Sequence, residues 1–237
     1  MTDLKSLEKK ISNYIKKNSP QNLKEYKLLD DAFSPEDIIQ GIKVLLSKKI
    51  TMGEITREFE YEFAKFLNVK YALMVNSGSS ANLISTFAAG NPKMKNYIKK
   101  NSKFLIQSLC WSTSLWPIIQ AGFKAEFVDV NIKTLNIDLD KFKRKLLQNK
   151  ISGAVIVHVL GCSSNIQEIS DICKKNKIFL IEDTCESLGT KYNNKYLGTF
   201  GDFGTYSFYY SHQITSGEGG MVVCKNQKDV REYICCP

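Results

Sequence analysis

Seven short apolar runs, separated by segments with helical periodicity, constrain the fold of this chain more than any other feature. Runs this short and this apolar are typical of strands buried on both faces of a sheet. The runs are Tyr71–Val75, Lys103–Gln107, Ala125–Asp129, Ala154–Val159, Ile178–Glu182, Thr205–Phe208 and Met221–Cys224. Because strands that alternate with helices form parallel sheets, we predict a three-layer α/β/α fold with a mostly parallel seven-stranded sheet. The spacing alone fits more than one doubly wound fold.

Amphipathic segments fill the intervals between these runs and also precede the first of them. The expected helices are Leu4–Lys17, Asp37–Leu46, Glu54–Leu67, Ala81–Ala89, Thr113–Gln120, Leu139–Gln148 and Ile166–Lys175. The first helix should stop at Ser19-Pro20, because proline cannot continue a helix. We therefore expect an N-terminal helical arm at residues 1–30 and one larger domain at residues 31–237.

Composition excludes several classes of protein. No apolar run is long enough to cross a membrane, and Met1–Lys17 contains no apolar signal-peptide core, so we expect no membrane partner. The seven cysteines are irregularly spaced and form no C-x-x-C pair, which indicates reduced thiols and a cytoplasmic location. The chain has a formal charge of +9, but its lysine pairs are dispersed, as on separate solvated helices. We expect no nucleic-acid partner, although such a charge attracts anionic substrates.

Three segments that follow apolar runs carry candidate ligand-binding groups. The sequence Asn76–Asn82 follows the first run and opens a helix, so its glycine, hydroxyls and N–H groups suit an anion, or simply cap the turn. Asp183 follows the run that begins at Ile178, at the strand end where parallel sheets bind ligands, although an aspartate there can also cap a helix. Trp111 follows the run at Lys103–Gln107 and is either a stacking platform or a core residue.

The ordered series NSGSSAN, Trp111, EDTCES, GTFGDFGTYSF, His212 and GEGG resembles the DegT/DnrJ/EryC1/StrS family of sugar aminotransferases. This resemblance extends from about Leu46 to about Glu232 and implies a fold type I enzyme that uses pyridoxal 5'-phosphate. The residue roles that it implies can be stated together. Gly78, Ser79 and Ser207 contact the cofactor phosphate, Trp111 stacks on the ring, Asp183 pairs with the pyridine nitrogen, and Glu186 lies near the ring oxygen.

His212 occupies the position at which the family carries the lysine that attaches the cofactor covalently. An imidazole moves protons near neutral pH but cannot form that bond. The chain therefore resembles the histidine-containing NDP-4-keto-6-deoxyhexose 3-dehydratase branch, with His212 as the catalytic base. The resemblance further implies pyridoxamine 5'-phosphate as a cofactor form, a nucleotide-sugar substrate, glutamate as amino donor, and a homodimer in the full-length form. The pathway implied is deoxysugar biosynthesis for lipopolysaccharide.

Several features keep other functions open. Gln213 stands where the dehydratases carry a second histidine, and the sequence stops at Pro237, before the family's small C-terminal domain, which we expect to be missing. A sugar-nucleotide aminotransferase and an inactive, truncated fragment remain alternatives. A related subfamily adds an iron–sulfur cluster, and Cys185 lies in a region that supplies one of its ligands, but we expect no metal site here. His158 is expected to be structural or peripheral to the site.

Overall fold

The computed structural model describes residues 2–18, 32–94 and 97–224. The chain divides into two compact units, residues 1–58 and 59–237, which are described separately below. The expected division near residue 30 falls among residues 19–31, outside the described residues, and therefore stays a prediction.

The first unit contains α1 (Thr2–Asn18), α2 (Pro35–Ser47) and the start of α3 (Glu54–Leu67). A capping box begins α2: the Ser34 hydroxyl accepts the N–H of Asp37, and the Asp37 carboxylate accepts the N–H of Ser34. An ion pair between Lys43 and Glu8, 3.0 Å long, joins α2 to α1. The predicted helices at Leu4–Lys17 and Asp37–Leu46 are thus present, each with a few additional residues.

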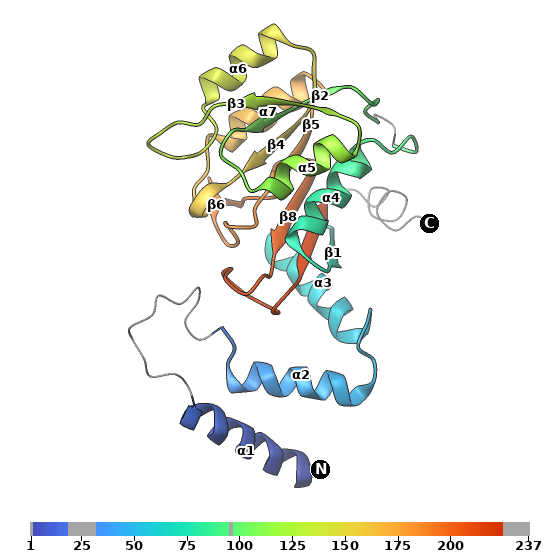
Figure 1. Cartoon of the computed structure of the whole chain (residues 1–237), viewed down its shortest axis with the longest axis vertical. Helices are drawn as coiled ribbons and strands as arrows, with labels where there is room; N and C mark the ends of the chain where they lie inside the picture. The colour runs from blue at the N-terminus through green and yellow to red at the C-terminus, as the bar shows by residue number, and fades with distance from the viewer. Residues whose placement is uncertain (1, 19–31, 95–96, 225–237) are drawn as a thin grey trace. The chain divides into compact units, whose positions relative to one another are not determined.

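The second unit is built on a seven-stranded sheet, in the order β1-β9-β8-β5-β4-β2-β3 (Figure 1). The strands are β1 (Tyr71–Val75), β2 (Lys103–Gln107), β3 (Lys124–Val128), β4 (Ile151–Val157), β5 (Phe179–Asp183), β8 (Phe203–Ser207) and β9 (Gly220–Cys224). Only β9 runs antiparallel to its neighbours, β1 and β8; the other pairs are parallel. The prediction of a mostly parallel seven-stranded sheet is confirmed.

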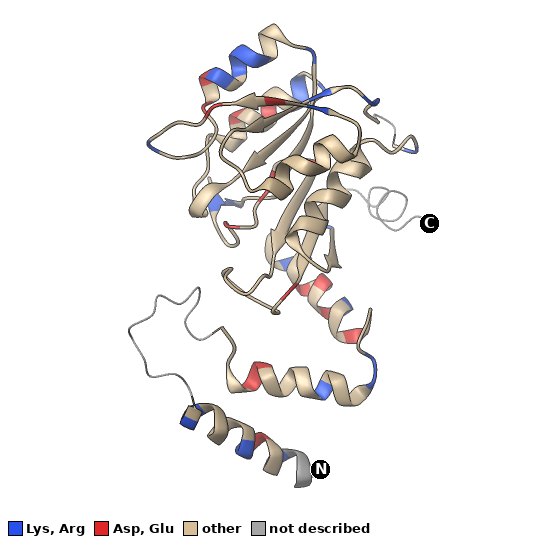
Figure 2. Ribbon diagram, viewed as in Figure 1, with Lys and Arg blue, Asp and Glu red and all other residues tan. Residues whose placement is uncertain are grey.

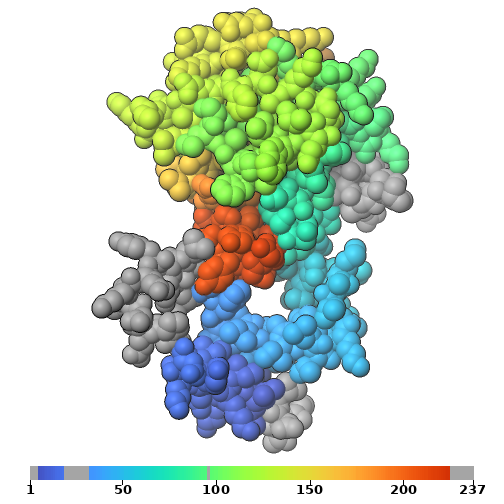
Figure 3. Space-filling view, in the orientation of Figure 1, coloured from blue at the N-terminus to red at the C-terminus, as the bar shows by residue number. Residues whose placement is uncertain are grey.

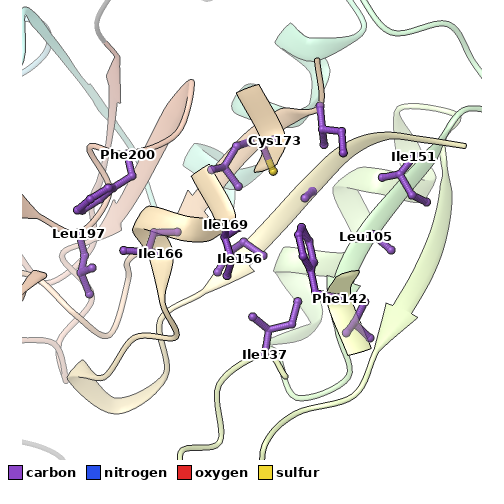
Figure 4. Close-up of a cluster of buried hydrophobic side chains, with 14 residues drawn as sticks. Leu105, Ile137, Phe142, Ile151, Ile156, Ile166, Ile169, Cys173, Leu197 and Phe200 are labelled. Carbon is purple, nitrogen blue, oxygen red and sulfur yellow. The ribbon is translucent and has the colours of Figure 1, made fainter. Parts of the chain in front are cut away.

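Helices cover both faces of this sheet. On one face lie α4 (Gly78–Ala89) and α5 (Ser112–Gln120), where buried residues such as Ile118 of α5 pack against Phe104 and Ile106 of β2. On the other face lie α6 (Leu139–Gln148) and α7 (Ile166–Lys175), whose Phe142 and Ile169 pack against the strands (Figure 4). This arrangement gives the three layers that the alternation of strands and helices predicts.

Most element ends are shifted by one to three residues from the expected bounds, and two features of the fold differ further from the sequence expectations. The fourth strand ends at Val157 rather than Val159, because the chain turns there through a short 3-10 segment in which Leu160 has φ +52°. A small hairpin, β6 (Lys191–Tyr192) and β7 (Lys195–Tyr196), was not expected. Its strands are too short to give an apolar run, but its turn residues Asn193 and Asn194 both have positive φ, as two-residue hairpin turns require.

Candidate active site

Asp183 is the last residue of β5, at the carboxyl end of the parallel part of the sheet. Its side chain is buried, with 4% exposed. One carboxylate oxygen, Oδ2, accepts hydrogen bonds from the Asn82 amide at 2.7 Å and from the Ser114 hydroxyl at 2.6 Å. The other oxygen, Oδ1, accepts the backbone N–H of Cys185 at 3.2 Å. A carboxylate is therefore held firmly at the edge of the sheet where ligands bind in such folds.

The amino end of α4 lies beside this strand end and has the features of an anion site. Ser77 caps the helix by accepting the N–H of Ser80, which leaves other first-turn N–H groups available. A Cβ placed on Gly78 would lie 2.6 Å from Cβ of Ser207 and 2.9 Å from Sγ of Cys185. Only glycine fits there, because residues of three predicted motifs meet at this point. The motifs are NSGSSAN, EDTCES and GTFGDFGTYSF.

The GEGG motif reaches the same place from β9. A Cβ on Gly220 would overlap the carbonyl oxygen of Ser77, so the backbones of these two motifs pack directly together. In Figure 3 the orange-red surface of the segment between β8 and β9 meets the blue-green surface of α4. Ser79 is exposed, and the nearly buried Ser207 accepts the N–H of Tyr209. The backbone and hydroxyl groups around this helix end can hold a phosphate without any basic side chain.

His212 lies in the segment between β8 and β9 and is half-buried. Its backbone N–H donates to the carbonyl of Tyr209, and its ring centroid lies 6.1 Å from that of Tyr209. Burial lowers the pKa of the imidazole, while the carboxylates of Glu186 and Asp183 act in the opposite direction. The structure thus brings His212 within electrostatic reach of both acidic residues, as a neutral imidazole at pH 7 that is able to accept a proton.

Gln213, the residue that departs from the dehydratase pattern, connects this segment to the loop after β5. Its side-chain amide donates to the backbone carbonyl of Glu186 at 2.6 Å. The Glu186 carboxylate in turn accepts the N–H of Leu160 at 2.9 Å. The Gln213 amide therefore connects the segment that contains His212 to the loop that contains Glu186.

Trp111 caps the amino end of α5 and is 73% exposed. Its backbone carbonyl accepts the N–H of Ser114, whose hydroxyl contacts Asp183, so the tryptophan lies one helical turn from the carboxylate. Its indole is thus accessible to a ligand rather than part of the core, and its stacking role stays a prediction.

Two cysteines lie near Asp183. Burial and the negative charge of Asp183 raise the pKa values of the Cys110 and Cys185 thiols, so both stay protonated at neutral pH. Protonated thiols are poor metal ligands. Within the described ranges, no group of three or more His, Cys, Asp or Glu side chains is arranged to hold a metal ion.

His158 and Glu182 form a buried pair next to the site. The His158 Nε2 atom lies 3.0 Å from Glu182 Oε2, and this carboxylate also accepts the backbone N–H groups of Gly198, Phe200 and Gly201. Burial by itself would raise the pKa of Glu182, but these partners hold it below its ordinary value. The pair fixes the chain segment 197–201 against β5 and has a structural role, as expected for His158.

The sequence interpretation missed three polar residues around Asp183: Asn82, Ser114 and Thr205. All three are buried, with at most 3% exposed. Asn82 lies within the NSGSSAN motif, and a polar residue at a position that α4 buries is a signal that could have identified it.

Among the described residues, no helix has the length and apolar character needed to cross a membrane. In the ribbon of Figure 2, lysine and arginine occur on several separate elements, including α1, α2 and α6.

The chain thus combines a doubly wound α/β/α fold, a helix N-terminus that suits a phosphate, and a buried carboxylate at the carboxyl end of a parallel strand. This combination is typical of a class of cofactor-binding enzymes. The family model for the DegT/DnrJ/EryC1/StrS aminotransferases matches residues 34–236, and the chain belongs to this family. The resemblance predicted from the motifs is confirmed.

Three relatives make the comparison specific. The GDP-4-keto-6-deoxy-D-mannose 3-dehydratase of Escherichia coli O55:H7 is 41% identical over 192 residues, 81% of this chain and 49% of the relative. A solved structure of a GDP-4-keto-6-deoxymannose-3-dehydratase mutant with bound GDP-perosamine superposes with a TM-score of 0.81, at 36% identity, over 89% of this chain and 54% of that one. Another, with a trapped PLP–glutamate geminal diamine, has a TM-score of 0.80, at 37% identity, with the same coverage. The chain spans about half the length of the curated relatives it matches.

Proposed function

We propose that this protein is a pyridoxal or pyridoxamine phosphate-dependent enzyme that removes the C3 hydroxyl of an NDP-4-keto-6-deoxyhexose in deoxysugar biosynthesis for lipopolysaccharide. The observation that carries the proposal is a half-buried imidazole, His212, at the lysine position of the family and within electrostatic reach of Asp183 and Glu186. The similarity to 3-dehydratases supports the same conclusion.

The residues present fit the cofactor. The end of α4 with Gly78, Ser79 and Ser207 would hold the phosphate, since Gly78 lets this helix end pack closely against Ser207 and a helix N-terminus presents backbone N–H groups that suit an anion. Asp183 would pair with the pyridine nitrogen, Glu186 would lie near the ring oxygen, and the exposed Trp111 would stack on the ring. When bound, the cofactor supplies an electron sink next to the reacting carbon.

His212 would serve as the general base. Its neutral ring nitrogen accepts the proton whose loss precedes departure of the C3 hydroxyl, and an imidazole, unlike an amine, leaves the cofactor free of covalent attachment to the protein. In the net reaction, the sugar C3–OH becomes C3–H while glutamate, the amino donor, is oxidised to 2-oxoglutarate and its nitrogen leaves as ammonia.

The partners follow from this reaction. The related dehydratase structure contains a nucleotide sugar and another contains glutamate, which supports both as reactants here. We further propose a homodimer in the full-length form and a cytoplasmic location, where thiols such as those of Cys110 and Cys185 would remain reduced.

Isotope tracing tests the proposal. The purified protein is incubated with cofactor, ¹⁵N-labelled glutamate and GDP-4-keto-6-deoxymannose, and the products are analysed by mass spectrometry. A dehydratase gives a sugar nucleotide that lacks one oxygen and contains no ¹⁵N, with labelled ammonia released. An aminotransferase, the alternative that the family name favours, retains ¹⁵N on the sugar. A protein that binds cofactor but releases neither product would be an inactive fragment.

A further inference from the structure

Asp183 is surrounded by a buried hydrogen-bond network of residues to which the sequence analysis assigns no role. We propose that Asn82, together with Ser114 and Thr205, positions the Asp183 carboxylate for its contact with the pyridine nitrogen of the cofactor. The inference rests on the proposed cofactor but concerns residues that would not touch the cofactor themselves.

The network joins four elements of the sheet and its helices. The Thr205 hydroxyl, on β8, donates to Oδ1 of Asn82 at 2.6 Å. The Asn82 amide nitrogen, on α4, donates to Oδ2 of Asp183, and the Ser114 hydroxyl, on α5, donates to the same oxygen. All four side chains are buried, so water cannot replace these partners.

The chemistry of the groups fixes the direction of each hydrogen bond. A carboxylate only accepts hydrogen bonds, so Asn82 must present its NH₂ group to Asp183. The Asn82 carbonyl then points away, where the Thr205 hydroxyl is the donor that satisfies it. The Thr205 hydroxyl, which also lies 3.3 Å from the carbonyl oxygen of Glu182, therefore favours the amide orientation that presents NH₂ to Asp183, although it does not itself donate to that carboxylate.

The two carboxylate oxygens of Asp183 accept different hydrogen bonds. Oδ2 accepts two short side-chain hydrogen bonds, whereas Oδ1 accepts the backbone N–H of Cys185 at 3.2 Å. The Cys185 thiol also interacts with this carboxylate, but a thiol is a weak donor, so Oδ1 can still accept a stronger one. The network thus fixes the rotation of the carboxylate and leaves one oxygen able to accept the N–H of a pyridinium ring.

The test compares equilibrium binding of pyridoxal phosphate with binding of its analogue in which C–H replaces the pyridine nitrogen. The variants are Ser114→Ala, Thr205→Val and Asn82→Leu, with the first two available if Asn82→Leu does not fold. Ser85→Ala is the matched control, because Ser85 is a fully buried serine of α4 whose hydroxyl has no partner among the described residues.

We expect the unaltered protein to prefer pyridoxal phosphate to the analogue, and each network variant to reduce this preference about tenfold, the effect of one hydrogen bond to a charged group. Ser85→Ala should keep the full preference. The proposal is overturned if the variants weaken both ligands equally, which is the signature of a general structural role, or if they leave the preference unchanged. An unaltered protein that binds neither ligand would refute the proposed function as well, whereas one that binds both equally would refute only the positioning role.

Discussion

Replacing Gly78 with alanine should destroy the phosphate cradle, and the geometry sets the size of the effect. The added Cβ would lie 2.6 Å from Cβ of Ser207, whereas carbon atoms in ordinary contact are about 3.5–4.0 Å apart, so the overlap is roughly 1 Å. The second neighbour, Sγ of Cys185 at 2.9 Å, blocks relief on that side. Overpacking of this kind costs about 1–3 kcal/mol, because α4 must move away from β8.

The assay measures both stability and ligand binding. Urea denaturation should show Gly78→Ala to be destabilised by that amount. If the same cost falls on the cofactor site, titration with pyridoxal phosphate should show roughly 5- to 140-fold weaker binding, since each 1.4 kcal/mol is a factor of ten. Gly41→Ala is the control: Gly41 lies inside α2 with nothing within 4 Å of an added Cβ, so it should stabilise by about 0.5–1 kcal/mol. If Gly78→Ala matched the unaltered protein in both measurements, the packing argument for the cradle would be wrong.

Three further predictions concern ionisable groups. His212→Lys should bind the cofactor covalently and retain ¹⁵N on the sugar, as intact mass after borohydride reduction and product analysis would reveal; unchanged dehydration without attachment would contradict the role of His212. Because protonation removes the base and burial lowers the pKa of His212, the pH–rate profile should fall only below pH 6.5, the ordinary histidine value. Glu186→Gln, which removes a charge that raises this pKa, should move the fall to lower pH, and a move to higher pH would count against the assignment. Glu182→Gln should lower the free energy of unfolding by about 3 kcal/mol at pH 7. Since the folded-state pKa of Glu182 is depressed, this difference should be full above about pH 4.5 and disappear as the pH falls through the folded value, whereas the exposed Glu54→Gln should change stability by less than about 1 kcal/mol at any pH.

The sheet could be predicted from the sequence because its strands are buried on both faces and therefore appear as uninterrupted apolar runs. Asp183 could be placed because strand ends in parallel sheets collect at one edge, so the position of a residue directly after such a run fixes its surroundings. The hairpin at Lys191–Tyr196 gave no such run, since two-residue strands have no measurable period.

The network around Asp183 could not be predicted from the sequence, for a different reason. Asn82, Ser114 and Thr205 come from three segments far apart in the chain. Only the packing of α4 and α5 on one face of the sheet directs Asn82 and Ser114 to a single carboxylate and brings Asn82 to Thr205. The exposure of Trp111 likewise depends on what packs around the start of α5 rather than on its neighbours in the chain.

The antiparallel strand β9 lies between β1 and β8, and this placement has a consequence for the order of folding. The first strand of the sheet forms its ladder with β9 alone, pairing Tyr71 with Cys224, roughly 150 residues later in the chain. A nascent polypeptide leaving the ribosome would therefore hold β1 without its strand partner until Gly220–Cys224 emerges. Hydrogen exchange during synthesis should then show the β1 amides that bond to β9 gaining protection last.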